Sequence, residues 1–161
     1  MMNPFHLHLL FNHLPIVGIY LSILVIFSGI ILKNQTVKNV ALCLIVISGI
    51  GAFIAHVTGE GAEESSELRN DFSHDLIEKH EHASEPFFQI MLALTLLSGV
   101  ALFFNLKKKN WSNYLIILIA IISIAAAYFA QQAGTSGGEI RHPEISDGSA
   151  TAIPSNAEDS H

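Results

Sequence analysis

The chain has 161 residues, of which 50% are apolar and 14% are charged, and its formal net charge at pH 7 is −6. The acidic balance argues against a nucleic-acid-binding role, which needs a basic surface. Long stretches of the chain also contain no charged residue, whereas a soluble domain has charged residues dispersed along its sequence.

Four apolar runs account for nearly half of the chain: residues 14–32, 40–57, 87–106 and 114–131. Each is close to the roughly 20 residues that a helix needs to cross about 30 Å of hydrocarbon. A helix also satisfies its own backbone hydrogen bonds, which lipid cannot do. The sequence therefore predicts an all-α integral membrane protein, a four-helix bundle with one transmembrane domain over residues 1–145.

A short amphipathic lead-in is expected before the first span, over residues 3–12. His6, Leu9 and His13 recur at helical spacing, and Pro15 falls where a helix tolerates a missing backbone N–H. His13 lies at the rim of the hydrocarbon, and an ionisable side chain at that depth indicates a functional position. The alternative is an interfacial histidine that binds water or lipid headgroups.

Basic residues set the expected orientation. Lys33 and Lys38 flank the first connection between spans, and Lys107–Lys109 form the third. By the positive-inside rule both connections lie in the cytoplasm, so both termini and the 58–85 insert lie outside a bacterial inner membrane. With five basic residues inside, the rest of the chain carries a formal charge of −11.

The insert between the second and third spans, residues 58–85, holds most of the acidic residues and three histidines. Gly59 and Gly61 are expected to end the second helix. A helix is expected to resume at Asp71 and to continue through Pro86 into the third span, with a kink. This outer helical insert is the most polar part of the chain.

One face of the resumed helix is apolar except for a single histidine. That face comprises Phe72, Leu76, His80, Ala83 and Phe87, whereas His74 and His82 fall among charged positions. The spacing predicts that His80 points into the bundle and that His82 is solvated. The simplest alternative for His80 is an imidazole hydrogen-bonded to a neighbouring carboxylate.

The last two spans carry no acid, base or histidine at mid-depth, which argues against a channel or a pump. After the fourth span, the glycines of GGEIRHPEI are expected to let the chain turn back and bring Arg141 and His142 to the outer face. The tail over residues 146–161 has a disordered composition.

Four segments resemble the signature segments of the domain-of-unknown-function 2231 family of bacterial membrane proteins: HLHLLFNHLPI, TGEGAEE, HEHASE and GGEIRHPEI. The resemblance covers His6 to about Ile145. The matching positions are His8, Asn12, His13, Pro15, Thr58, Gly59, Glu60, Ala62, Glu63, Glu64, His80, Glu81, Ala83, Gly138, Arg141, His142 and Glu144. His56 and His82 match no signature position. The resemblance implies redox work by association, since similar domains are sometimes fused to Rieske iron–sulfur or c-type cytochrome domains.

The chemistry of the outer face allows two kinds of cofactor site. A b-type haem for electron transfer needs two facing imidazoles and a basic group for the propionates. His13 and His80 would supply the pair, His56 above the small Gly49 and Ala52 is a reserve ligand, and Arg141 would meet a propionate. A divalent zinc, iron or copper ion accepts mixed imidazole and carboxylate ligands. That set is His8, His13, His80, His142, Glu60, Glu63, Glu64 and Glu81.

If the chain binds haem, its expected partner is a membrane redox complex or an exported electron carrier, besides the lipid bilayer itself. A third class needs no cofactor: an accessory subunit of a larger membrane complex, with the histidines as partner ligands or pH sensors. No nucleophile, phosphate-loop or hydrolase motif is present in the sequence, so an enzyme is not expected. The single cysteine, Cys43, falls within the second apolar run.

Overall fold

The computed structural model describes residues 4–67, 74–109 and 111–142, and of residues 4, 5, 60–67 and 141 it describes the backbone alone. Within these ranges the chain forms five α-helices and no strand: α1 (Pro4–Phe11), α2 (His13–Ile31), α3 (Gln35–Glu67), α4 (His74–Leu106) and α5 (Ser112–Arg141). The tail expected over residues 146–161 lies outside the described residues.

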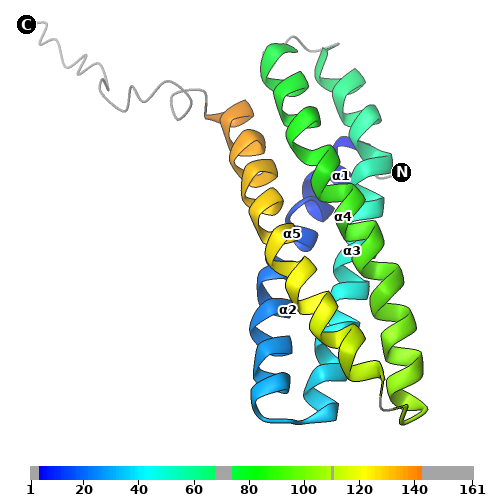
Figure 1. The fold of residues 1–161 in the computed structure, drawn as a ribbon. Coiled ribbons are helices and arrows are strands. Elements are labelled where there is room, and N and C mark those ends of the chain that lie inside the picture. Colours follow the sequence, from blue (N-terminus) through cyan, green and yellow to red (C-terminus); the bar gives the residue numbers. More distant parts are fainter. Residues whose placement is uncertain (1–3, 68–73, 110, 143–161) are drawn as a thin grey trace, which may run out of the picture.

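Helices α2 to α5 form an up-and-down bundle (Figure 1). Each packs against the next along the chain, and α5 closes the ring by packing against α2. The α2–α3 and α4–α5 connections meet at one end, which we call the lysine end because Lys33, Lys38 and Lys107–Lys109 lie there. The opposite end, with α1, the start of α4 and the end of α5, is called the histidine end.

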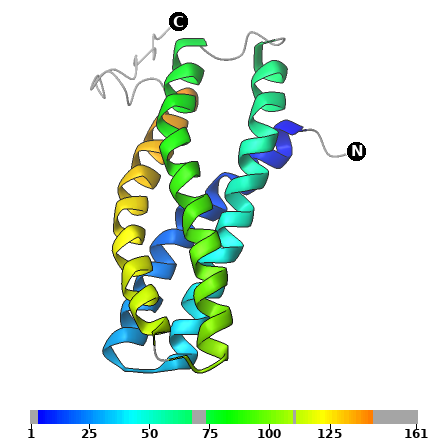
Figure 2. The ribbon, with the colours of Figure 1, turned by 45° about the vertical axis from the view of Figure 1, so that its right-hand side comes forward.

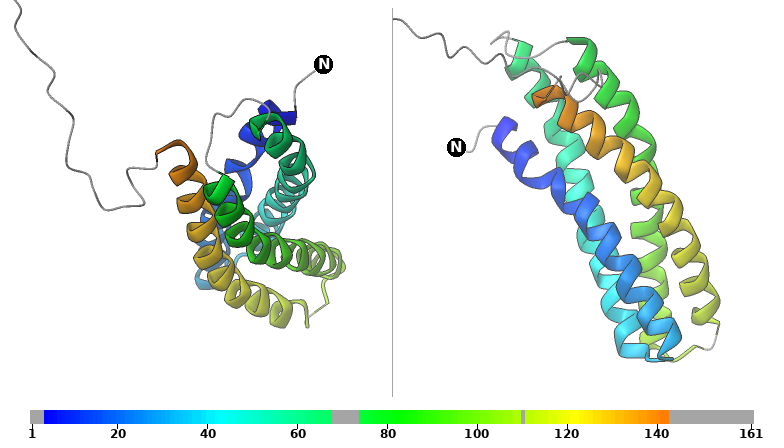
Figure 3. Two further views of the ribbon diagram at one scale, coloured as in Figure 1. Left: turned by 90° about the horizontal axis from the view of Figure 1, so that it is seen from above. Right: turned by 90° about the vertical axis from the view of Figure 1, so that its left-hand side faces the viewer.

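Helix α1 is an offshoot of the bundle at the histidine end. It packs mainly against α3 and lies beside the upper part of that helix (Figures 2 and 3). The chain bends between α1 and α2 at Asn12, whose backbone N–H still donates to the His8 carbonyl over 2.9 Å. The lead-in is therefore a separate helix that carries His8 onto the side of α3.

The apolar residues divide into an inner and an outer set. Fully buried side chains from all four long helices fill the centre: Ile19, Ile26, Leu42, Ile45, Met91, Leu94, Ile116 and Ile119. Many others of equal size point outward, among them Leu24, Ile50, Phe53, Leu96, Phe103 and Ile121. Four helices are long and apolar enough to cross a membrane. An apolar exterior on this scale is typical of a protein surrounded by lipid, so the chain is a four-helix membrane protein.

Small residues allow the helices to approach closely, as the sequence predicts. A Cβ added at Gly49 of α3 would overlap the Thr95 hydroxyl of α4, and one added at Gly18 of α2 would overlap the Ser48 side chain of α3. In lipid, the hydrophobic effect does not drive helices together, because the lipid tails are as apolar as the side chains. The van der Waals packing that close backbone approach allows is therefore a main source of helix association.

Polar side chains join three helices at the lysine end. The largely buried Lys38 of α3 donates from Nζ to Asn113 Oδ1 of α5 over 2.9 Å. The amide of Asn105 of α4 bonds to Asn39 of α3, and the Ser112 hydroxyl donates to Asn105 Oδ1 over 3.1 Å. These groups satisfy one another where the helices leave the apolar region, so they fix the register of α3, α4 and α5.

Two expected helix ends are wrong. Helix α3 does not stop at Gly59 and Gly61 but continues to Glu67, and the chain does not turn back at Gly137 and Gly138 but stays helical to Arg141. A glycine inside a helix costs only about 1 kcal/mol. At Gly137 the missing side chain makes room for an imidazole, because a Cβ there would lie 3.1 Å from the His80 ring. A Cβ at Gly59 would lie 3.7 Å from the His8 ring, which is an ordinary contact distance.

The expected passage of the fourth helix through Pro86 is confirmed, because α4 is one helix from His74 to Leu106. The proline sits just before Phe87, where the polar part of α4 gives way to its apolar run. The polar part, residues 74–85, therefore extends beyond the apolar bundle and carries His80 between α1 and α5.

Candidate functional site

His80 and His8 are the partly buried histidines among those whose burial is described, and His80 faces α5. Its Nδ1 lies 3.0 Å from the Ser136 hydroxyl oxygen. Ser136 is buried and donates its own hydrogen to the Ala133 carbonyl over 3.1 Å. Since that hydrogen is committed, Ser136 Oγ accepts from His80, and Nδ1 must carry the proton. The neutral ring therefore presents the lone pair of Nε2.

His8 approaches from α1 and has the same tautomer. Its Nδ1 lies 2.8 Å from the Ala55 carbonyl oxygen of α3. A carbonyl can only accept, so Nδ1 of His8 donates and Nε2 again holds the free lone pair. The anchor fixes His8 to a helix 47 residues away in sequence.

The charge of His8 acts on the His80 imidazole. Burial lowers the pKa of His80 below its ordinary value, and the positive charge of a protonated His8 lowers it further, while a hydrogen bond to the Ala133 backbone acts in the opposite direction. His80 belongs to residues 74–85, outside the apolar run of α4. Both causes favour the neutral imidazole, which is the form that binds metal ions.

The predicted orientations of His80 and His82 are confirmed. Leu76, His80 and Ala83 are partly buried and Phe87 is buried, whereas His82 is exposed. His82 Nε2 lies 3.7 Å from a carboxylate oxygen of Glu78, one turn earlier in α4. The carboxylate partner expected as the simplest alternative for His80 is replaced by the Ser136 hydroxyl.

His13 does not pair with His80 in the structure. It is exposed at the start of α2, and its Nδ1 bonds to the neighbouring Asn12 side chain. The histidine beside His80 is His8 instead. The bend at Asn12 accounts for this difference, because it separates the helix that carries His8 from the one that begins with His13.

His56 and His142 contact residues other than His80. The His56 ring is exposed and stacks on Phe88 of α4, with ring centroids 3.9 Å apart. The expected shallow groove beneath it is closed, because Gly49 and Ala52 are buried and Gly49 packs against Thr95. His142 is exposed and caps α5, donating its backbone N–H to the Gly138 carbonyl over 3.0 Å.

The predicted acidic shell is only partly described. Glu81 is exposed on α4. Glu60, Glu63 and Glu64 belong to the last turns of α3, and their side chains, like that of Arg141, lie outside the described part. In the part of the chain whose side chains are described, no three His, Cys, Asp or Glu side chains are grouped to hold a metal ion. The expected cluster of His13, His80 and His142 is thus not formed.

The surroundings of His80 do not fit the expected haem pair. A porphyrin axial ligand needs an apolar slot beside the imidazole. Here Gly137 packs on one side of the ring and Ser136 holds it, while His13 lies exposed on another element.

Sequence reasoning missed the contribution of α5. Ser136 and Gly137 contact His80, and the buried Glu139 pairs with Lys79 of α4, with Nζ and Oε2 2.5 Å apart. A weak signal was present: Ala133, Ser136, Gly137 and Ile140 recur at helical spacing, so a continuous helix would place small residues on one face.

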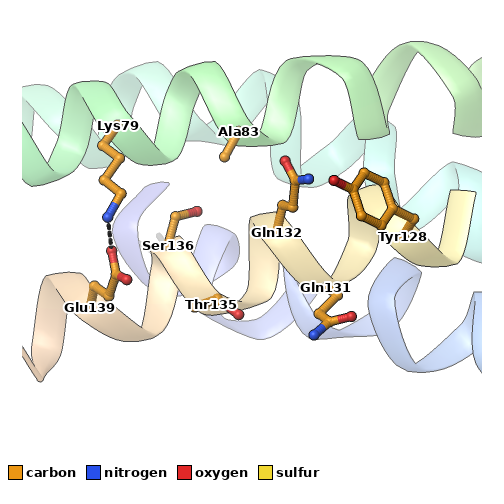
Figure 4. Close-up of a pocket in the computed structure, with 8 residues that line it drawn as sticks. All are labelled: Lys79, Ala83, Tyr128, Gln131, Gln132, Thr135, Ser136 and Glu139. Carbon is orange, nitrogen blue, oxygen red and sulfur yellow. Dashed lines mark hydrogen bonds and ion pairs between the residues drawn. The ribbon is translucent and has the colours of Figure 1, made fainter. Parts of the chain in front are cut away.

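The same α4–α5 seam carries a groove of about 340 Å³. Figure 4 shows it between Lys79 and Ala83 of α4 and a row of polar side chains on α5. Its lining is completed by Tyr128, Gln131, Gln132, Thr135, Ser136 and Glu139. Ser136 thus touches both the groove and His80.

No protein-family model, no curated protein and no solved structure matches the chain.

Proposed function

We propose that the chain is a membrane protein that binds a divalent transition-metal ion at its histidine end through Nε2 of His8 and of His80. The proposal rests on one observation: the imidazoles of His8 and His80 have the same tautomer. Each Nδ1 is held by a protein oxygen, the Ala55 carbonyl or the Ser136 hydroxyl, which leaves Nε2 as the nitrogen that carries the lone pair.

This arrangement is typical of histidine ligands. A metal-binding imidazole donates its other ring N–H to a protein oxygen, which fixes both the tautomer and the orientation of the ring. Because His8 of α1 and His80 of α4 are already held by these hydrogen bonds, ion binding requires no further loss of side-chain entropy at the two rings. The ion would then join α1 to the end of the bundle.

Helix α3 carries further candidate ligands in its sequence. Gly59 lies next to the His8 ring, and Glu63 follows Gly59 by four residues in the same helix. That spacing puts both positions on one side of α3. Zinc, iron and copper accept two imidazoles with a carboxylate or water, so mixed ligation of this kind fits the residues present. The resemblance to the domain-of-unknown-function 2231 family includes His8, Glu63 and His80.

The experiment is a metal titration of the full chain in detergent, after treatment with a chelator. We expect Zn²⁺ to bind at one ion per chain in calorimetry. Replacing His8 or His80 by Ala should lower the affinity by more than about 100-fold, because a ligand is lost. Ser136→Ala keeps both imidazoles and removes only an anchor, so a loss of roughly 10- to 100-fold is expected.

His82→Ala is the matched control, because His82 is on the same helix and outside the pair. Its affinity should equal that of the unchanged chain. Equal losses in the His80 and His82 variants, or the absence of saturable binding, would contradict the proposal. A Soret band in the purified protein would support the haem expectation in its place. Ser136→Ala keeps the test decisive if His80→Ala fails to fold.

A further inference from the structure

The groove between α4 and α5 lies where the apolar part of the bundle ends. On α5, Tyr128 belongs to the last turn of the apolar run, and Glu139 lies three turns further toward the histidine end. On α4, Lys79 and Ala83 precede Phe87, where the apolar run begins. The groove therefore starts at the edge of the hydrocarbon and extends into the headgroup region.

The groove contains polar groups that the protein itself does not satisfy. The side chains of Tyr128, Gln131, Gln132 and Thr135 are exposed, and none makes a hydrogen bond within the described ranges. In the headgroup region these exposed donors and acceptors are available to a ligand that carries both.

The charges of the groove balance. Lys79 and Glu139 are the two charged residues of the lining, and they pair with each other. The Glu139 side chain is only 9% exposed, whereas that of Lys79 is 55% exposed. A ligand with only a negative charge would be repelled by the Glu139 carboxylate, and one with only a positive charge would be repelled by the Lys79 ammonium. A ligand with one charge of each sign complements both.

An apolar path continues below the groove. Tyr128, Ile124 and Ile121 recur at helical spacing on α5, and all three are exposed. They lead from the groove into the hydrocarbon, as the acyl chains of a bound lipid must.

We propose that this groove binds the headgroup of a zwitterionic phospholipid with a primary ammonium group, of the phosphatidylethanolamine type. The phosphate oxygens accept from Lys79 Nζ and from the Gln132 amide, which points toward α4 (Figure 4). The ammonium donates to Glu139, and its N–H groups distinguish it from choline, which has none. This site is separate from the histidine pair and does not depend on it.

The test is competition among three phospholipids with identical acyl chains, measured by native mass spectrometry of the full chain. We expect phosphatidylethanolamine to be retained over phosphatidylcholine and phosphatidylglycerol. Glu139→Gln should reduce the preference over phosphatidylcholine about tenfold, the change expected when one charge-assisted hydrogen bond is lost. Lys79→Gln removes a contact to the phosphate, which all three lipids carry, so it should lower the retention of phosphatidylethanolamine and phosphatidylcholine alike and leave that preference unchanged. The preference is a ratio, so it is insensitive to a general loss of stability.

Two variants serve as controls. Glu78→Gln removes an exposed carboxylate of α4 that pairs with His82, and Gln89→Leu removes an exposed amide that bonds to Glu85. Both lie outside the groove and should keep the preference. Equal retention of the three lipids, preferred retention of phosphatidylglycerol, or an unchanged preference over phosphatidylcholine in the Glu139 variant would each overturn the proposal.

Discussion

At the scale of single residues, the orientation of His80 depends on the missing side chain of Gly137. Gly137 lets α5 come close enough for Ser136 to accept from His80 Nδ1. A Cβ at Gly137 would stand 3.1 Å from the ring carbon Cε1, closer than ordinary packing allows. The adjacent Gly138 has open space around it.

Gly137→Ala should therefore weaken Zn²⁺ binding, because the His80 ring must shift away from Ser136. We expect a loss of roughly tenfold, the lower end of the effect of disturbing an outer-shell partner. The measurement is the same calorimetric titration. Gly138→Ala is the neighbouring control and should bind as the unchanged chain does. If both variants lost affinity alike, the cause would be a general effect of alanine on the end of α5.

At the scale of the helices, close backbone approach explains several glycines. At Gly29 of α2 the close neighbour is backbone, since a Cβ there would lie 2.9 Å from the backbone nitrogen of Lys38 in α3. A backbone atom cannot rotate away, unlike the end of a side chain. The short connection between α2 and α3 holds the two helices together at this point.

Gly29→Ala should destabilise the bundle by about 1–3 kcal/mol, the usual cost of forcing extra volume into a packed site. Gly99→Ala in α4 is the control, because nothing lies within 4 Å of the added Cβ. There the better helix propensity of Ala should leave stability unchanged or slightly higher. Unfolding in a denaturing detergent, followed by circular dichroism, measures both. Equal stability of the two variants would rule out the close approach at Gly29.

At the scale of the whole molecule, charge separates along the bundle axis. The lysine end carries Lys33, Lys38 and Lys107–Lys109, whereas the acidic residues whose side chains are described lie at the histidine end. Each short connection at the lysine end contains lysine, which is the feature that orients membrane proteins during insertion.

We predict that the lysine end is cytoplasmic and that the C-terminus is exported. A reporter fused after Lys108 should be active only inside the cell, and one fused at the C-terminus only outside. The positive-inside rule is the reason, since basic loops are retained. The reverse pattern would place the histidine pair and the lipid groove on the cytoplasmic side.

The sequence alone determined the fold class, the four spans and the inward direction of His80. These are local properties: the length of an apolar run measures the hydrocarbon, and the spacing of Leu76, His80 and Ala83 defines one face of a helix. It also indicated, through small residues such as Gly18, that the helices pack closely. The expected helix ends at Gly59 and Gly137 are wrong, because a glycine that ends a helix and one that lies inside a helix, as Gly137 does beside His80, are identical in the sequence.

Only the tertiary structure decided which groups meet at the histidine end. The charge of His8 acts on His80 because α1 bends away at Asn12 and packs on α3, and Ser136 contacts His80 because α5 stays helical beyond its apolar run. Both depend on contacts between residues more than 45 positions apart, such as His8 with Ala55 over 47 positions and His80 with Ser136 over 56. Helical periodicity relates residues within a few turns, so no spacing in the sequence encodes these partners.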